Sequence, residues 1–450
     1  MAKKKEENTN ASVLDDLIES EFSDMEDLSK VDSAVPYWID SGNWALNYAM
    51  SKKFRGGYPG GRISNLWGQS GTGKSMLPAT ASKAKNWNNM NLDLFDRIIV
   101  IDSEGGGTGK SLFSFVGAPM EKVRYVKINT LDSYRISNSD PSKMEAVKDE
   151  EVPSKLETST YTYKRGLLCF IKKLIYALQY SKTKERVLII VDSISNIKSF
   201  RVAVEGGEDM GKTNKLLNNL FNLDNNINEV GASMLLVSKV YTNLNNPYDP
   251  WVMSGGQSVM FNPSVNLKLT VMSDGSDITD AQMKEEKLRR KSALGNSMKV
   301  IRATVTKSRF GTENRNVWIL LDATYGIVKN SGLFDLLVDF GACKKNGTRY
   351  TVPGVIVDEK GNDISFFKKD FLSIFGKKEN EYIDKLQVIM EKIEEDIKNK
   401  RMNIDVNDID EYNEEVDADD TAESSVSDML KQMEVEKEMD AEKAMEEKNE

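Results

Sequence analysis

Residues 68–75 form the stretch of the sequence with the clearest chemical signature. They fit the pattern G-x-x-x-x-G-K-[ST] and stand between a predicted strand and a predicted helix. Glycines in such a loop allow backbone amides to point at phosphate oxygens, and the helix N-terminus and a lysine add positive charge. The final hydroxyl, that of Ser75, is suited to bind Mg²⁺. The predicted phosphate-binding residues are Gly68, Gln69, Ser70, Gly71, Thr72, Gly73, Lys74 and Ser75.

Two other apolar runs end in carboxylates that phosphoryl transfer could use. Residues 187–191 lead into Asp192, which we expect to help hold Mg²⁺. Residues 98–101 are followed by Asp102 and Glu104. Transfer of a phosphoryl group to water needs a side chain that orients the attacking water, and the chain contains no histidine for this task. We therefore assign the role to Glu104, for which an ordinary solvated loop acid is an equally good explanation, and interpret Asp102 as structural.

Short apolar runs that alternate with helical patterns surround these motifs from residue 36 onward. Such alternation predicts an α/β fold, with a mostly parallel twisted sheet flanked by helices. Pro78 lies early in the helix after the phosphate loop, where proline is tolerated only within the first turn. The segment 137–160 is polar and is interpreted as a surface excursion. The predicted strands are 63–67, 98–101, 187–191, 234–237, 265–271, 300–305 and 317–321, and the predicted helices include 166–180 and 214–228.

The chain divides into segments of different character. Residues 1–35 contain one apolar helical stripe, which could cover its own domain or serve oligomerisation against a neighbouring subunit. Residues 36–330 form the predicted ATPase core. Residues 331–402 are predicted to form a small C-terminal domain, and residues 403–450 an acidic disordered tail.

Composition excludes several classes of function. The chain of 450 residues has no histidine and two cysteines, Cys169 and Cys343. These counts exclude Ser-His-Asp catalysis, histidine metal sites, zinc clusters and a disulfide framework. There is no run of 18 apolar residues, and the first residues lack the apolar segment of a signal peptide. We therefore expect a cytoplasmic protein without a membrane partner, in the host cytoplasm if the chain is viral.

Charge is distributed unevenly along the chain. The formal net charge is −9, yet residues 401–450 carry 19 acidic and 5 basic side chains. Residues 1–30 carry 9 acidic and 4 basic side chains, which leaves residues 31–400 with a net charge of +10. A basic body with acidic ends suits an anionic partner, and ordinary surface charge explains the pattern equally well.

The order of these motifs resembles that of the RecA/RadA recombinases, in particular the phage members of that family. The similarity extends over about residues 36–350. It implies a RecA-like P-loop ATPase core that uses ATP and Mg²⁺ and hydrolyses ATP in response to DNA. The stretches that carry it are I-D-S-G at 39–42, G-G-R-I at 60–63, I-D-S-E at 101–104, V-D-S-I at 191–194, S-G-L at 331–333 and F-G at 340–341.

The resemblance also implies roles for residues outside the phosphate loop. Glu104 corresponds to the water-activating glutamate of the family. Lys307 and Arg309 correspond to two cations that contact the ATP of the adjacent subunit, although both could be ordinary surface cations. Lys239 occupies the position that senses the γ-phosphate, where bacterial members have glutamine. A lysine meets phosphate as a point charge and lacks the donor and acceptor pair of an amide.

Two loops would bind DNA according to the same resemblance. The first loop spans about residues 203–211 and the second spans 241–257. The second loop contains no lysine or arginine, so backbone amides, small polar groups and aromatic rings would contact the strand. For the aromatic residues, packing within the loop is an equally good explanation. The candidate DNA-binding residues are Met210, Gly211, Lys212, Lys215, Asn243, Tyr248, Trp251, Gly255 and Gly256.

The implied function is that of a recombinase which forms ATP-dependent filaments on single-stranded DNA. It would catalyse homologous pairing and strand exchange in recombination, repair and recombination-dependent replication. The implied partners are single-stranded DNA, homologous duplex DNA, further copies of the chain in a helical filament, a single-strand-binding protein and a loading mediator. Two alternatives remain open: a hexameric replicative helicase with a similar motor, and a nucleotide-gated DNA scaffold that does not hydrolyse ATP.

Overall fold

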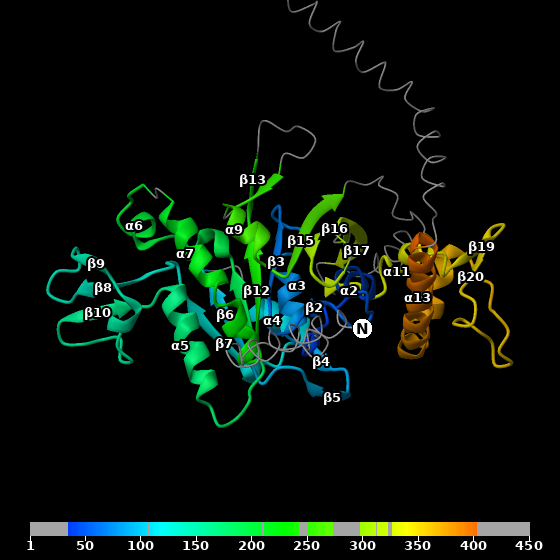
Figure 1. Ribbon diagram of the computed structural model, residues 1–450, viewed down its shortest axis with the longest axis horizontal. Helices are drawn as coiled ribbons and strands as arrows, with labels where there is room; N and C mark the ends of the chain where they lie inside the picture. Colours follow the sequence, from blue (N-terminus) through cyan, green and yellow to red (C-terminus); the bar gives the residue numbers. More distant parts are fainter. Residues whose placement is uncertain are drawn as a thin grey trace, which may run out of the picture.

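A nine-stranded sheet passes through the middle of the molecule, with helices packed on both faces and a smaller lobe beyond each end (Figure 1). The computed structural model describes residues 35–105, 109–208, 211–242, 251–254, 256–272, 298–311, 313–322 and 326–402. Within these residues, no helix combines the length and apolar character needed to cross a membrane.

Six neighbouring strands of the main sheet are parallel, and the three at one end are antiparallel. Every residue of the central strands β3, β11 and β12 is buried, as expected for parallel strands covered on both faces. The spatial order is β18 (Gly326–Ile327), β17 (Arg315–Asp322), β16 (Met298–Ser308), β15 (Val265–Met272), β3 (Ile63–Gly68), β12 (Ala232–Ser238), β11 (Val187–Asp192), β6 (Arg97–Asp102) and β7 (Val123–Lys127).

Alternate side chains of each strand enter two separate cores. In β6, Ile98 and Val100 belong to one buried cluster, whereas Ile99 and Ile101 belong to another on the opposite face. The first cluster includes residues of α2 (Trp44–Ser51), α3 (Met76–Ala81) and α4 (Lys110–Val116). The second includes residues of α5 (Leu167–Gln179), α7 (Lys212–Phe221), α8 (Asp224–Glu229) and α9 (Gly256–Phe261).

All seven runs predicted as strands belong to this sheet, which confirms the mixed α/β fold with a mostly parallel sheet. The helix predicted at 166–180 is confirmed as α5. The helical stretch predicted at 214–228 is confirmed, but it forms two helices that are separated at Asn222 and Leu223. Asp224, which opens α8, accepts a hydrogen bond from the Ile63 amide at 3.1 Å and so ties this bend to the start of β3.

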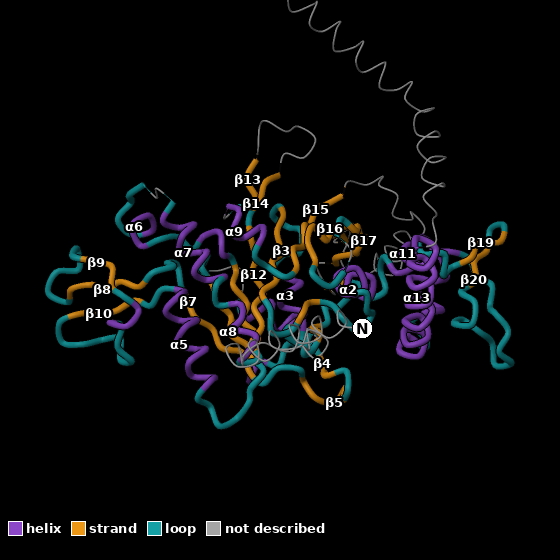
Figure 2. Tube along the Cα trace, viewed as in Figure 1, coloured by secondary structure: helices purple, strands orange, loops and turns teal. Residues whose placement is uncertain are grey.

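The polar segment 137–160, predicted to be a surface excursion, is largely exposed and contributes to a three-stranded antiparallel sheet (Figure 2). Its strands are β8 (Ser133–Ser137), β9 (Met144–Val147) and β10 (Tyr161–Lys164). Few apolar residues stabilise this lobe: Val147 and Val152 pack with Cys169 of α5 in a small cluster of their own. Because so few of its residues are apolar, the pattern of the sequence favoured a loop here. The lobe continues towards α6 (Phe200–Ala203) through the rings of Tyr134 and Phe200, whose centroids are 4.9 Å apart.

Four two-stranded ribbons complete the described strands. They are β1 (Trp38–Ile39) with β2 (Tyr58–Pro59), β4 (Lys85–Asn86) with β5 (Asn89–Asp93), β13 (Val240–Thr242) with β14 (Trp251–Met253), and β19 (Lys344–Asn346) with β20 (Arg349–Thr351).

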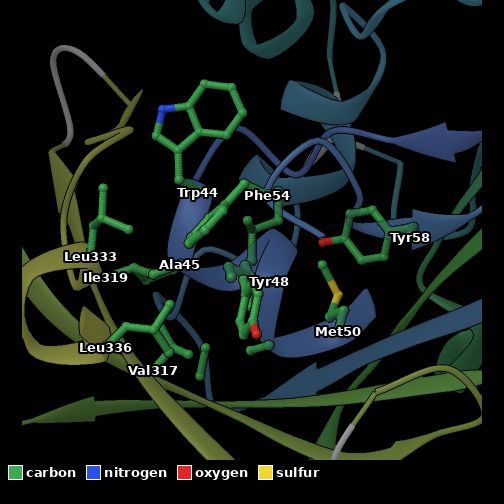
Figure 3. Close-up of a cluster of buried hydrophobic side chains, with 14 of the residues drawn as sticks. Trp44, Ala45, Tyr48, Met50, Phe54, Tyr58, Val317, Ile319, Leu333 and Leu336 are labelled. Carbon is green, nitrogen blue, oxygen red and sulfur yellow. The ribbon is translucent and has the colours of Figure 1, made fainter. Parts of the chain in front are cut away.

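Residues 331–402 share the core of the sheet instead of forming a core of their own. Their helices are α11 (Leu333–Asp339), α12 (Phe371–Phe375) and α13 (Glu379–Met402). Asn43 caps α2 by accepting from Leu46 N, and its amide donates to the Ser331 carbonyl at 2.9 Å. Tyr48 donates to Glu394 of α13 at 2.8 Å. Figure 3 shows Trp44, Ala45 and Tyr48 of α2 with Val317 and Ile319 of β17 and Leu333 and Leu336 of α11.

Truncation of Leu337 should therefore destabilise the sheet and the C-terminal helices together. Leu337 is 0% exposed, and Leu337→Ala should lower the free energy of unfolding by about 2–5 kcal/mol, mainly through the cavity it leaves. Val338 on the same helix is 39% exposed, so Val338→Ala is the matched control, with an effect within about 0.5 kcal/mol. Urea unfolding followed by circular dichroism measures both. A Leu337→Ala effect confined to a separate minor transition would show that residues 331–402 fold independently.

Candidate functional site

The phosphate loop connects β3 to α3 in a conformation held by its own hydrogen bonds. Gly68 has a φ of 152°, and a Cβ there would lie 2.1 Å from the Leu269 carbonyl oxygen, so no larger residue fits. Thr72 Oγ1 and Lys74 Nζ both donate to the carbonyl of Gln69. Pro78 is the third residue of α3 and thus lies within its first turn, as the sequence requires.

A cavity of about 700 Å³ opens beside this loop. It lies where the carboxyl ends of β3, β12, β11 and β6 meet, because parallel strands bring these ends to one edge of the sheet. The sequence motifs at 68–75, 104, 192 and 239 are thereby brought together. The charged and hydroxyl residues of the lining are Ser70, Lys74, Ser75, Glu104, Asp192, Ser193, Lys239, Lys299 and Asp322.

Asp192 and Ser75 offer oxygen ligands on one side of the cavity. Burial raises the pKa of Asp192, and the charges of Glu104 and Asp102 act in the same direction, whereas a hydrogen bond with Ser75 opposes them. Among the described residues, no cluster of three or more acidic, cysteine or histidine side chains could hold a metal alone. A hydroxyl and a carboxylate nevertheless fit Mg²⁺, which is usually bound by one or two protein oxygens together with phosphates and waters.

Asp102 fixes the start of the loop that carries Glu104. It is 2% exposed and accepts hydrogen bonds from the amides of Glu104 at 2.7 Å and Gly105 at 2.9 Å. Tyr125 of β7 donates to its second oxygen at 2.7 Å. Burial alone would raise the pKa of Asp102, but these hydrogen bonds lower it below its ordinary value. A carboxylate engaged in this way holds backbone in place, in line with the structural interpretation of this residue.

Glu104 projects into the cavity and is held by two side chains. Its Oε1 accepts from Ser193 Oγ at 3.0 Å and pairs with Lys239 Nζ, also at 3.0 Å. Lys239 follows β12, and its amide donates to Ser195 Oγ at 2.8 Å. Separate arguments from the sequence assigned Glu104 and Lys239 to a bound phosphate, but no sequence pattern predicts that the two side chains form an ion pair. That pair follows from the spatial order of the strands.

Two charged residues of the cavity were missed by the sequence reasoning. Lys299, near the start of β16, places its Nζ 3.4 Å from the carbonyl oxygen of Gly71. Asp322 ends β17 and is buried. Both come from antiparallel strands, so only the register of β15, β16 and β17 shows that they approach the phosphate loop.

The structure does not bring Lys307 and Arg309 to this cavity. Lys307 follows Lys299 by eight positions on the same strand, which separates their backbones by about 27 Å at the rise of a β-strand. Its ammonium donates to the Phe261 carbonyl, and burial and the charge of Arg309 lower the pKa of Lys307. Lys307 lines a second cavity of about 600 Å³ with Trp67, Tyr241, Trp251 and Phe261.

Of the described DNA-binding candidates, Gly211, Lys212 and Gly256 lie at the starts of two helices that touch each other. Gly211 precedes α7, and Lys212 pairs with Asp132 at 2.9 Å. Gly256 opens α9 against Asn214 of α7, and Ser258 of α9 donates to Asn218 of α7. Lys215 is exposed, and Trp251 is half-buried in β14. Met210, Asn243, Tyr248 and Gly255 lie outside the described residues, as do the segments 1–34 and 403–450.

No protein-family model matches this chain, and no curated protein matches it. The chemistry of this site is therefore inferred from the residues that line the cavity at the phosphate loop. This cavity combines a glycine-rich loop that carries Lys74, a hydroxyl and carboxylate pair suited to Mg²⁺, and the carboxylate of Glu104.

The protonation of Lys74 should control the affinity of this cavity for a triphosphate. Burial lowers the pKa of Lys74 to about 8, although the charges of Asp192 and Glu104 oppose the shift. A polyanion favours the protonated form, so affinity should be constant well below pH 8 and fall by up to about tenfold per pH unit above it.

Titration of the protein with a fluorescent ATP analogue and Mg²⁺, from about pH 7 to about pH 9.5, measures this dependence. Arginine keeps its charge over the range, so Lys74→Arg should bind more weakly but without the pH dependence. An equal fall of affinity in wild type and Lys74→Arg would contradict the assignment to Lys74.

Proposed function

We propose that this chain is a DNA-dependent ATPase that acts as a strand-exchange recombinase. The observation that carries the ATPase proposal is the convergence of Lys74, Asp192 and Glu104 on one cavity at the phosphate loop. Each of the three has a distinct task in phosphoryl transfer, and they come from three different strand ends.

In the proposed reaction the loop amides and Lys74 hold the phosphates of ATP. Mg²⁺, when bound by Ser75 and Asp192, would neutralise charge on the β- and γ-phosphates. Glu104 orients a water whose oxygen attacks the γ-phosphorus while the bond to the β,γ-bridging oxygen breaks. The proton of the water passes to Glu104 and then to the phosphate products, and ADP and phosphate leave.

The positions of the cations support assembly into a polymer. Lys307 lies far along β16 from the phosphate loop of its own chain, and Arg309 follows the end of that strand. These two cations could therefore contact a triphosphate only in a neighbouring copy. The adjoining starts of α7 and α9 would place the two DNA loops together. With the motif resemblance, these features favour a RecA-like filament on single-stranded DNA that pairs with homologous duplex DNA. Its loading by a mediator in competition with a single-strand-binding protein belongs to the same proposal.

Three measurements on the full chain separate this function from its alternatives. ATP hydrolysis with and without single-stranded DNA separates an ATPase from a nucleotide-gated scaffold. Electron microscopy with a non-hydrolysable ATP analogue and single-stranded DNA should show helical filaments, whereas closed rings of fixed size would indicate a hexameric helicase. A strand-exchange assay with homologous duplex DNA tests the recombinase activity directly.

Hydrolysis should require residues from two copies of the chain. Lys307→Ala should reduce DNA-stimulated hydrolysis by about 10³-fold or more, since cations supplied in trans are worth about 10³–10⁵ in rate. Glu104→Ala should reduce it by about 10²–10⁴-fold, because the attacking water loses the group that orients it. A mixture of the two variants should regain activity at interfaces that pair an intact Glu104 with an intact Lys307. The ATPase rate is measured across mixing ratios, with each variant alone as the control. Co-assembly without any recovery would show that Lys307 does not act across the interface.

A further inference from the structure

The ion pair between Lys239 and Glu104 occupies the centre of the candidate catalytic site. Lys239 Nζ lies 3.0 Å from Glu104 Oε1, with side chains 48% and 33% exposed. Ser193 Oγ donates to the same oxygen. Both partners line the cavity of the phosphate loop, so a bound triphosphate would share this space with them.

In this arrangement Glu104 cannot orient an attacking water through the oxygen that the ammonium covers. A partly exposed ion pair is weak, because solvent screens it. A γ-phosphate carries more negative charge than one carboxylate and accepts hydrogen bonds on three oxygens, so it competes well for a lysine ammonium. Ser193 would still hold Glu104 after the lysine has left, since its hydroxyl comes from the end of β11 and not from β12.

We propose that Lys239 is a latch on Glu104, which a γ-phosphate opens by drawing the lysine away from the carboxylate. This inference rests on the proposed ATPase function and makes Lys239 a positioning residue for Glu104. A diphosphate lacks the group that competes for Lys239, so the latch stays closed with ADP. The site thereby couples recognition of the triphosphate to exposure of its water-orienting carboxylate.

A double-mutant cycle on nucleotide binding tests the latch without relying on turnover. The probes are the β,γ-imido analogue of ATP and ADP, each with Mg²⁺, titrated against the full chain. Glu104→Gln abolishes the ion pair but leaves Lys239 available, so it should tighten binding of the ATP analogue. Part of this increase in affinity comes from the loss of repulsion between Glu104 and the phosphate. A further factor of about two to five in affinity should come from breaking the ion pair.

This extra factor should vanish when Lys239→Met is the background, because no pair is then left to break. It should persist with Lys299→Met, the matched control, since that lysine lines the same cavity but contacts the phosphate loop instead of Glu104. Lys239→Arg, which can form the same pair, should restore it. For ADP the extra factor should be absent, so Glu104→Gln should change the affinity for ADP by the same factor, within about twofold, in every background.

The same gain from Glu104→Gln in the wild-type and the Lys239→Met backgrounds would overturn the latch, as would equal tightening of ADP and the ATP analogue. Hydrolysis by the wild type, measured in parallel, separates the two proposals. If the wild type hydrolyses ATP but the two substitutions have additive effects on nucleotide affinity, the latch proposal is wrong and the ATPase proposal stands. If the effects of the two substitutions are coupled but no ATP is hydrolysed, the latch is supported and the ATPase proposal is wrong. If the protein does not bind the ATP analogue, both proposals are wrong.

Discussion

The carboxyl ends of parallel strands meet at one edge of a sheet, and the chemistry of this chain depends on that constraint. The phosphate loop follows β3, Glu104 follows β6, Asp192 ends β11 and Lys239 follows β12. These positions span more than 170 residues of sequence, yet they line one cavity. The constraint holds only while both faces of the sheet remain covered, which explains why the central strands are buried along their whole length.

Antiparallel strands at the other end of the sheet have the opposite effect, since they distribute cations between two places. β16 starts at the edge that carries the phosphate loop and runs away from it, so Lys299 lies at the cavity and Lys307 does not. Two lysines of one strand thereby belong to two different cavities. The first is lined by the phosphate loop and several charged side chains, whereas the second is lined mainly by aromatic and other large side chains.

The sequence predicted the sheet because buried parallel strands are continuous apolar runs, which can be recognised in a sequence without knowledge of the tertiary structure. The sequence also singled out Asp192 and Glu104 at strand ends, and both line the cavity of the phosphate loop. It could not predict contacts that depend on the spatial order of strands, which no local pattern encodes. The Lys239–Glu104 pair, the approach of Lys299 to Gly71 and the bend at Asp224 all belong to this group. The lobe of β8, β9 and β10 escaped prediction for another reason, because its few apolar residues give no periodic signal.

The balance of charge in the cavity constrains how a ligand can enter. Three lysines (Lys74, Lys239 and Lys299) and three carboxylates (Glu104, Asp192 and Asp322) line it. A triphosphate alone would satisfy the lysines but would face the carboxylates across a partly desolvated space, and a divalent cation alone would meet the reverse penalty. A complex of the two carries charge of both signs and can match both sets at once. If such a complex binds, the buried Asp192 carboxyl, whose pKa burial raises, would gain a compensating cation at the same time as Lys74 gained an anion.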